Sequence, residues 1–493
     1  MEPSPPASLK DLCAAIRARE LSSEELVSTC LDRIEERNGR VNAFCRLFAE
    51  EALSEARGCD ADARQGVFRG PLHGIPAGIK DLFATRGRIA ARGSRAFQNN
   101  VPKETSPIVE RLLDAGAIML GKTTTTEFGW SGSSVSELYG ETRNPWNPAL
   151  TSGGSSSGSG AALAGRMVPI ALGSDGGGSV RIPAAFCGIF AMKGSLGRIP
   201  AYPWSATEML SHAGPMTVSA EDSAFLFNIL KGPDPRDHQS LPDDGIDYLR
   251  HEIAPAKLRI AFAPTLFDYP VHPEIAAVVR QAVERIMPAL GATAHAVSPD
   301  WSDPIDIFEI LWVVGRGVVY GNSAVDPAQF GPGFRRLVED SRRYGVSDYL
   351  TAMQRRAAFA ATVHAFFADY DLLLLPTVPE KPFAAEAEGP AAQRPGQRAA
   401  SEILPWTAWT PFTYPFNISG NPAASLPCGF TPDGLPVGLQ VVGRRHEDAT
   451  VLGFCRAIER VSPWNSFLPP LAQAGGKRGP EPPQPLPAME KIQ

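Results

Sequence analysis

Short, largely apolar runs recur along the chain and alternate with longer stretches that mix apolar and polar residues. Such runs, when glycine or proline bounds them, are typical of strands that are covered on both faces of a sheet. We therefore expect strands at residues 75–79, 117–120, 168–172, 258–263, 372–375, 423–426 and 437–442.

Two stretches between the runs have helical periodicity. Residues 22–38 combine a capping box of Ser22 and Glu25 with an apolar stripe, and Asn38-Gly39 is a helix stop signal. Residues 347–368 form a second, longer helical pattern. Strands that alternate with helices predict an α/β fold, with a mixed, mostly parallel sheet that helices cover on both faces.

No linker divides the chain cleanly, so we predict one large domain over residues 1–474. The stretch 475–493 is rich in proline and predicts a disordered tail. Residues 380–401 are polar and poor in apolar side chains, which predicts a loop.

The overall composition excludes several classes of protein. The chain has 493 residues, of which 43 % are apolar and 20 % charged, with a formal net charge of -6. These values indicate a folded chain without the strongly basic surface that binds nucleic acid. No run reaches the roughly 18 apolar residues of a membrane span, and the first residues lack the pattern of a secretory signal. We therefore expect a cytoplasmic protein with no membrane span and no nucleic-acid partner.

The cysteines and histidines give no sign of a metal site. The seven cysteines contain no CxxC pair and the eight histidines no HxxxH pair. Close spacing of such residues is the usual mark of a zinc site, so we expect reduced thiols, no metal ion and no cofactor.

Two clusters of glycine and serine flank the predicted strand at residues 168–172. They read TSGGSSSGSG at residues 151–160 and GSDGGGS at residues 173–179. One interpretation is a pair of flexible loops, and a second is a phosphate-binding loop, although neither GxxxxGK[ST] nor GxGxxG is matched. A third is acyl transfer, because Ser179 would lie on a turn whose backbone N–H groups converge as in an oxyanion hole.

A serine nucleophile needs a base, because its hydroxyl is barely ionised at neutral pH. Neither cluster contains a histidine, and the known substitute is a lysine that burial keeps neutral. Lys80 ends the apolar run of GIPAGIKD and suits this role, although a lysine at a strand end is more often a surface charge.

Several separate motifs closely resemble those of the amidase signature family. They occur in the family's order, between roughly residues 9 and 459, as GIPAGIKD, GKTTTTEFGWSGSS, GGSSSGSGAALAG, ALGSDGGGSVRIPAAFCGI, FNISGNPAASLPCGF and GLPVGLQVVG. The resemblance implies a triad of a nucleophilic serine, a second serine preceded by a cis peptide bond, and a lysine. By position these are Ser179, Ser155 and Lys80.

The same resemblance implies supporting roles for further residues. Ser156 and Asp175 match positions that hold the triad by hydrogen bonds, and Arg181 matches the arginine that follows the nucleophile. The oxyanion hole is expected from the backbone N–H groups of Gly176, Gly177, Gly178 and Ser179.

Structural roles are predicted for the competing residues. Lys122 also ends an apolar run, but its place in the family pattern favours a structural role. Cys187 follows small apolar residues and is predicted to be a buried packing residue. The other serines of the clusters are predicted to be loop or cap residues, namely Ser152, Ser157, Ser159 and Ser174.

The family acts on many amides, so its fold does not name the substrate. Thr410 stands where the glutaminase subunit of tRNA-dependent amidotransferases has an acidic residue for the substrate's amino group, which disfavours glutamine. Residues 404–416 are rich in aromatic side chains, which predicts either an apolar acyl or aryl pocket or plain packing under a loop.

We therefore predict a stand-alone hydrolase of neutral, fairly apolar small-molecule amides, similar to aryl-acylamidases or urethanases. Carbamates and esters are further expected substrates, since attack on a carbamoyl carbon uses the same relay and oxyanion hole. The expected assembly is a monomer or homodimer. The alternatives are a glutaminase-type subunit of an amidotransferase complex and a non-hydrolytic binding subunit.

Overall fold

The predicted apolar runs form strands of one large sheet in the computed structural model, which describes residues 8–323, 325–399, 401–464 and 466–473. Within these residues the strand order is β1-β3-β2-β6-β8-β7-β12-β13-β11-β9-β10. The strands are β1 (Phe44–Leu47), β2 (Pro76–Lys80), β3 (Ile118–Thr123), β6 (Ile170–Asp175), β7 (Phe190–Lys193), β8 (His212–Thr217), β9 (Ile260–Phe262), β10 (Ala294–Ala296), β11 (Leu372–Pro376), β12 (Ala423–Phe430) and β13 (Pro436–Gly443). A separate antiparallel pair consists of β4 (Val135–Ser136) and β5 (Gly140–Glu141).

Neighbouring strands of the large sheet run in both directions. β2 is parallel to β3 and β6, and β9 is parallel to β10 and β11. The other six neighbouring pairs among the described strands are antiparallel. The mixed sheet is thus confirmed, but the predicted predominance of parallel pairs is wrong. A strand that is buried on both faces has the same apolar sequence in either direction, so the runs carry no information about direction.

Helices fill the connections between most strands. In the described residues they are α1 (Leu9–Ala18), α2 (Ser23–Val41), α3 (Ala49–Arg64), α4 (Pro107–Asp114), α5 (Ser157–Ala164), α6 (Arg181–Cys187), α7 (Ala220–Leu230), α8 (Pro273–Ala289), α9 (Ile305–Gly321), α10 (Pro332–Asp340), α11 (Val346–Asp369), α12 (Pro415–Ile418) and α13 (Asp448–Val461). The pattern at residues 347–368 corresponds to α11.

The capping box predicted for α2 is present, because Ser22 and Glu25 exchange hydrogen bonds between side chains and backbone N–H groups. The helix ends about one turn later than the stop signal predicts, at a left-handed Asn42 with φ of 53°. Asn38 stays helical and instead uses its side chain to hold both backbone groups of Phe44. The Asn38 side chain, which can terminate a helix, therefore holds the segment that leads from α2 into β1.

Alternate side chains of β11 enter two different hydrophobic cores. Leu372 and Leu374 belong to one core, and Leu373 and Leu375 belong to the other. The first core contains side chains of α8 and α13, and the second contains those of α9 and α11. Since successive side chains of a strand point to opposite faces, helices cover both faces of this part of the sheet, as predicted.

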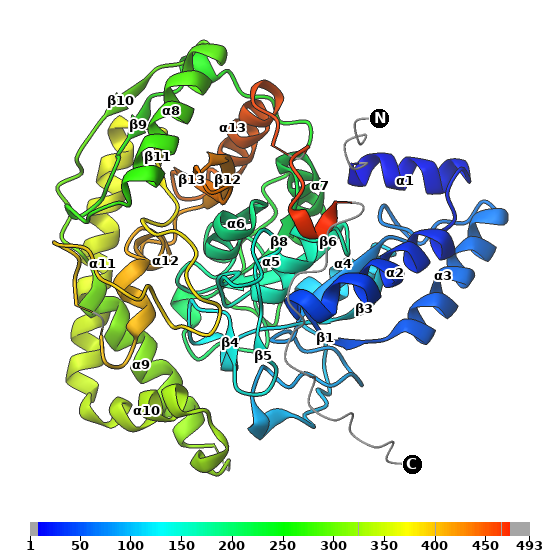
Figure 1. Cartoon of the computed structure of the whole chain (residues 1–493), viewed down its shortest axis with the longest axis horizontal. Helices are drawn as coiled ribbons and strands as arrows, with labels where there is room; N and C mark the ends of the chain where they lie inside the picture. Colours follow the sequence, from blue (N-terminus) through cyan, green and yellow to red (C-terminus); the bar gives the residue numbers. More distant parts are fainter. Residues whose placement is uncertain (1–7, 324, 400, 465, 474–493) are drawn as a thin grey trace.

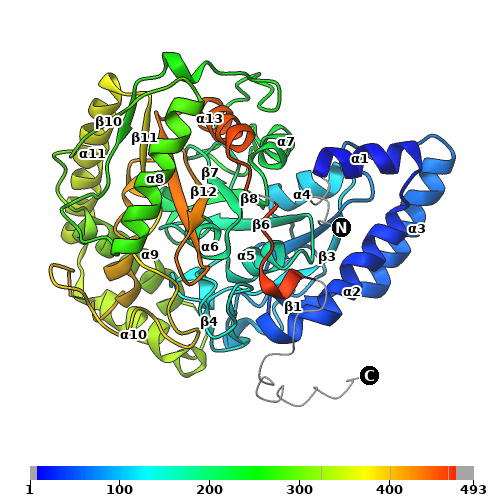
Figure 2. The same cartoon turned by 45° about the horizontal axis from the view of Figure 1, so that its top comes forward.

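Figure 1 shows α9, α10 and α11 grouped on one side of the molecule, in green to yellow, and the blue helices α1, α2 and α3 at the opposite end. In Figure 2, α2 and α3 lie side by side, and α8 and α13 lie together over β12 and β13. The single α/β domain is confirmed, while the predicted boundary at residue 474 and the tail at 475–493 lie outside the described residues.

Two further observations concern the whole described chain. All seven cysteines carry free thiols, and all except Cys45 are buried. Among the described residues, no helix combines the length and the apolar character that crossing a bilayer requires.

Candidate active site

The site lies where two neighbouring parallel strands end. β2 and β6 pair in parallel, with Ile79 opposite Leu172, so their carboxyl ends meet at the same edge of the sheet. Lys80 is the last residue of β2, and Ser174 and Asp175 end β6. Ligand sites of α/β sheets form at this edge.

Lys80 has no exposed surface, and three hydroxyl groups surround its amine. Its Nζ atom lies within hydrogen-bonding distance of Ser155 Oγ at 2.9 Å, Ser156 Oγ at 2.8 Å and Ser174 Oγ at 3.0 Å. Burial lowers the pKa of Lys80 well below the ordinary lysine value; the Asp175 carboxylate opposes this shift and the Arg316 guanidinium adds to it. Lys80 is therefore placed to act as an uncharged base.

Ser155 and Ser179 come from the two glycine- and serine-rich clusters and line one cavity. The Gly154–Ser155 peptide bond is cis. The clusters are joined by a hydrogen bond from the Ser156 N–H to the Ser179 carbonyl, at 3.2 Å. Within the part of the chain that the structure describes, no hydrogen bond joins the Oγ atoms of Ser155 and Ser179.

The turn that carries Ser179 connects β6 to α6. At Gly178 φ is 129°, a conformation that glycine adopts without strain, and its N–H donates to Asp175 Oδ1 at 2.8 Å. Among the described residues, no hydrogen bond occupies the backbone N–H groups of Gly176, Gly177 and Ser179. These three groups are free to bind an oxyanion, whereas that of Gly178 already serves the turn.

Aromatic side chains press directly against this turn. A Cβ atom at Gly176 would lie 2.7 Å from the Trp312 ring, and one at Gly177 would lie 2.8 Å from the Phe308 ring. Both rings come from α9. The close approach of α9 therefore requires glycine at positions 176 and 177.

A buried ion pair holds the base of the turn. Arg181 donates to both carboxylate oxygens of Asp175, at 2.9 and 3.0 Å, and to Asn417 Oδ1 at 2.7 Å and Gln440 Oε1 at 2.8 Å. Burial raises the pKa of the Asp175 carboxyl, but Arg181, Lys193 and Asn417 together outweigh it, so that the pKa lies below the ordinary aspartate value. The carboxylate stays charged and fixes Gly178 through its N–H.

The structure brings together every residue that the sequence proposes for the site, and it adds others. Ser174 is predicted to be a loop or cap residue, but its hydroxyl accepts a hydrogen bond from Lys80 and so belongs to the site. Asn417 and Gln440 belong to two of the family-like motifs, FNISGNPAASLPCGF and GLPVGLQVVG, but only the fold shows that they bind Arg181. No motif indicates Arg316, which lies on α9.

The competing residues have structural surroundings. Lys122 donates from Nζ to the Phe83 carbonyl at 2.7 Å and to Thr85 Oγ1 at 3.0 Å, and it does not line the cavity. Cys187 is buried, and its Sγ atom is 3.4 Å from the Ser152 carbonyl. The hydroxyls of the other three serines donate to backbone carbonyls, as Ser152 to Thr142, Ser157 to Thr124 and Ser159 to Leu172.

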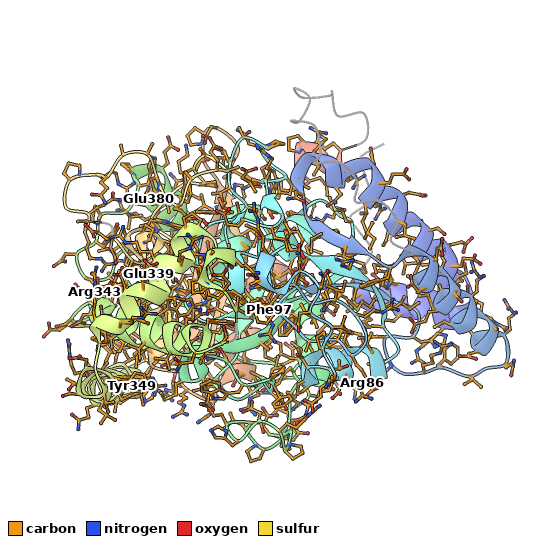
Figure 3. All side chains as sticks on the ribbon, turned by 90° about the horizontal axis from the view of Figure 1, so that it is seen from below. Arg86, Phe97, Glu339, Arg343, Tyr349 and Glu380 are labelled. Carbon is orange, nitrogen blue, oxygen red and sulfur yellow. The ribbon has the colours of Figure 1, made fainter. Side chains whose placement is uncertain are left out.

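The cavity in front of Ser179 has a volume of about 330 Å³. Its aromatic lining is Phe83, Phe97, Phe128, Tyr202, Trp204, Trp312 and Tyr320. Figure 3 shows Phe97 between the yellow-green helices and the blue N-terminal part of the chain. The aromatic residues of 404–416 do not line this cavity; Trp406 and Tyr414 instead pack against Phe308. For that segment, packing is the correct alternative.

Comparisons with known proteins agree with this geometry. A family model described as Amidase matches residues 25–452. An acylamidase of Rhodococcus erythropolis is 33 % identical over 94 % of this chain and 97 % of its own length. One subunit of the glutamyl-tRNA(Gln) amidotransferase of Thiobacillus denitrificans is 35 % identical over 94 % of this chain and 99 % of its own length.

Solved structures of amidases share the whole fold. A 6-aminohexanoate cyclic dimer hydrolase, solved in complex with its substrate, covers 95 % of this chain and 99 % of its own, with a TM-score of 0.85 and 27 % identity. A bacterial aryl acylamidase of the amidase signature enzymes covers 94 % of this chain and 97 % of its own, with a TM-score of 0.84 and 29 % identity. The chain therefore belongs to the amidase signature family and is an amide-hydrolysing enzyme.

Proposed function

We propose that this enzyme cleaves the C–N bond of neutral, fairly apolar amides through an acyl-enzyme on Ser179. The observation that carries the proposal is the buried Lys80 amine within hydrogen-bonding distance of Ser155, beside the turn that presents Ser179. A serine hydroxyl becomes a nucleophile only where a base removes its proton, and no histidine is needed if that base is a neutral lysine.

The proton path runs through both serines. Neutral Lys80 takes the proton of Ser155 Oγ, and Ser155 takes that of Ser179 Oγ while Ser179 attacks the scissile carbonyl. For this step the Oγ atoms of Ser155 and Ser179 must approach each other once substrate is bound, and catalytic hydrogen bonds often close only in that complex. The reverse path protonates the leaving amine, after which water hydrolyses the acyl-enzyme.

The negative charge of the tetrahedral intermediate lies on the former carbonyl oxygen of the substrate, which we place against the turn before Ser179. The unoccupied N–H groups of Gly176, Gly177 and Ser179 are the proposed oxyanion hole. Each donor of this kind contributes roughly 3 to 4 kcal/mol to the transition state. Ser156 hydrogen-bonds to Lys80 and holds the base, while Asp175 and Arg181 hold the turn in place.

The cavity supports an apolar acyl or aryl group next to the scissile bond. Its aromatic lining, with Phe97, Phe128 and Trp312 among others, matches the need of a small-molecule site for apolar walls with few polar groups. The similarity to an acylamidase and an aryl acylamidase supports the same class. Carbamates (urethanes) and esters fit the same relay and are proposed as additional substrates.

The second candidate is a glutaminase-type subunit of an amidotransferase complex, which the similarity to the glutamyl-tRNA(Gln) amidotransferase protein favours. Against it, Thr410 is buried, and its hydroxyl donates to the Trp406 carbonyl instead of offering a carboxylate to an amino group. Release of amine from simple amides by the purified chain alone supports the stand-alone hydrolase. Activity with glutamine only, and only with a partner, would support the second candidate.

We further propose a cytoplasmic monomer or homodimer whose domain spans residues 1–474.

The triad is tested by substitution and a p-nitroanilide assay. We expect Ser179→Ala and Lys80→Ala each to lower kcat/KM by at least about three orders of magnitude, because either change removes the relay. Ser323→Ala is the matched control, since Ser323 also lines the cavity but belongs to no part of the relay. Full activity in either triad variant, with the fold intact by circular dichroism, would refute the role of that residue.

A covalent label identifies the nucleophile independently. We expect an organophosphonate or sulfonyl fluoride to modify the peptide that contains Ser179, as peptide mass mapping can show. A label found only on other peptides would contradict the scheme.

A further inference from the structure

An arginine without an acidic partner lines the catalytic cavity. Arg316 lies on α9 with a relative exposure of 7 %, so more than nine tenths of it is buried. Its Nη1 donates to Thr207 Oγ1 at 2.9 Å, and its guanidinium lies 3.5 Å from the centre of the Trp312 ring. In the described residues its other two nitrogens, Nε and Nη2, have no hydrogen-bond partner. Neither is among the fully inaccessible side-chain atoms that lack a partner, so both keep some accessible surface. They therefore face the cavity.

The charges around the cavity are not balanced by the protein. Asp175 is the one carboxylate among the lining residues of the described chain, and Arg181 already pairs with it. A second cation, Arg92, also lines the cavity, and the described ion pairs do not include it. The cavity thus contains two arginines and no free acid.

A buried charge without a partner is costly to a fold, and a cation over an aromatic ring offsets only part of that cost. Burial lowers the pKa of Arg316 to about 9, which still leaves the side chain protonated at neutral pH. Arg316 makes no hydrogen bond to the relay among the described residues and affects Lys80 only through its charge. The remaining partner for its free N–H groups is a molecule inside the cavity.

We infer that Arg316 is a specificity residue that binds a carboxylate of the substrate, so that the preferred amides carry one carboxylate beyond an apolar spacer. A guanidinium offers paired N–H donors that match a carboxylate, and such charge-assisted bonds are the strong ones. The inference rests on the proposed hydrolase activity of Ser179. Neutral amides remain substrates, with water on the guanidinium in place of a carboxylate.

The size of the cavity limits the spacer. Arg316 and Ser179 both line the same space of about 330 Å³, whose walls also include Trp312, Phe128 and Tyr320. A short alkyl chain or one aromatic ring fits such walls, and the carboxylate then lies at its far end. Half-amides of short dicarboxylic acids and amides of aminobenzoic acid have this form.

Two pairs of substrates test the inference. The first compares the p-nitroanilides of glutaric and pentanoic acid, and the second compares the butyryl amides of 4-aminobenzoate and 4-toluidine. We expect kcat/KM for the charged member of at least one pair to exceed that of its neutral counterpart by about ten- to a hundredfold. In Arg316→Gln this preference is expected to fall to within about threefold.

The control is Arg356→Gln, which removes a partly buried arginine of α11 that does not line the cavity and is expected to keep the wild-type preference. Equal or lower kcat/KM for the charged member of both pairs, or a preference that survives in Arg316→Gln, overturns the inference. Failure of the proposed function looks different, because then neither member of either pair is hydrolysed and Ser179→Ala changes nothing.

Discussion

A lysine acts as a base only when it is uncharged, and the surroundings of Lys80 favour this form because burial lowers its pKa. It has no exposed surface, its three hydrogen-bond partners are neutral hydroxyls, and no carboxylate of the described residues contacts its amine. An acid in direct contact would stabilise the ammonium form and raise its pKa. Asp175, the acid that raises the pKa of Lys80, pairs with Arg181 instead of contacting the amine, so the ion pair that shapes the turn also favours a neutral Lys80.

This arrangement fixes the direction of the pH dependence. Below the pKa of Lys80 the amine is protonated and cannot accept a proton, so kcat/KM for a neutral p-nitroanilide is expected to fall with falling pH. Because burial and Arg316 both lower that pKa, Arg316→Gln is expected to shift this acid limb to higher pH. Arg356→Gln is the control and is expected to leave the limb in place. A limb unaffected by Arg316→Gln contradicts the electrostatic role of Arg316.

At the scale of elements, the turn between β6 and α6 depends on contacts from two directions. α9 presses two aromatic rings against it, and Arg181 fastens it to α12 and β13 through Asn417 and Gln440. The turn therefore has no freedom to relax without moving three other elements.

Gly177→Ala tests the contact with α9. Its Cβ atom would lie 2.8 Å from Phe308 and 2.9 Å from Trp406, so the turn must shift and misalign its N–H groups. We expect kcat to fall by about a hundredfold, as for a displacement of about 1 Å in other active sites. Gly39→Ala is the control, because nothing lies within 4 Å of its added Cβ atom. Unchanged kcat in Gly177→Ala counts against the oxyanion hole proposed here.

Arg181→Met tests the buried ion pair. The substitution leaves the Asp175 carboxylate charged and unpaired in the interior, which is expected to cost about 3 to 5 kcal/mol of unfolding free energy. Urea unfolding followed by circular dichroism measures this loss. Arg57→Met breaks an exposed pair with Glu24, whose side chains are 55 % and 45 % exposed, and is expected to cost less than about 1 kcal/mol. A loss for Arg181→Met as small as that expected for Arg57→Met would mean that Arg181 contributes little to stability.

At the scale of the whole molecule, the sequence predicts best what is local. Lys80, Ser155 and Ser179 stand in contiguous motifs. Each predicted apolar run contains a strand, because burial on both faces of the sheet requires a continuous run of apolar residues. The direction of the strands is not predictable in this way, since it depends on how distant segments pair. The role of Ser174 escapes for a related reason, because only the pairing of β2 with β6 places it beside Lys80.

The cavity wall is the least predictable part. α9 has an ordinary apolar helical sequence without a motif, and residues 404–416 look more like a substrate pocket than α9 does. Long-range packing decides which of the two segments lines the cavity. Trp312 and Arg316 of α9 line it, whereas Trp406 packs against the Trp312 ring and does not line it. Residue type alone cannot distinguish an aromatic ring that lines a cavity from one that supports it.

The close approach of α9 to the turn has a practical meaning for enzyme engineering. On this helix Trp312 lies against the turn at Gly176, while Arg316, Val319 and Tyr320 line the cavity. A library restricted to Val319 and Tyr320 is expected to change substrate choice while keeping Arg316, whose charge lowers the pKa of Lys80. Substitution of Trp312 is instead expected to lower kcat, because this ring supports the turn at Gly176. The same helix therefore contains positions that can be varied and a position that must be kept.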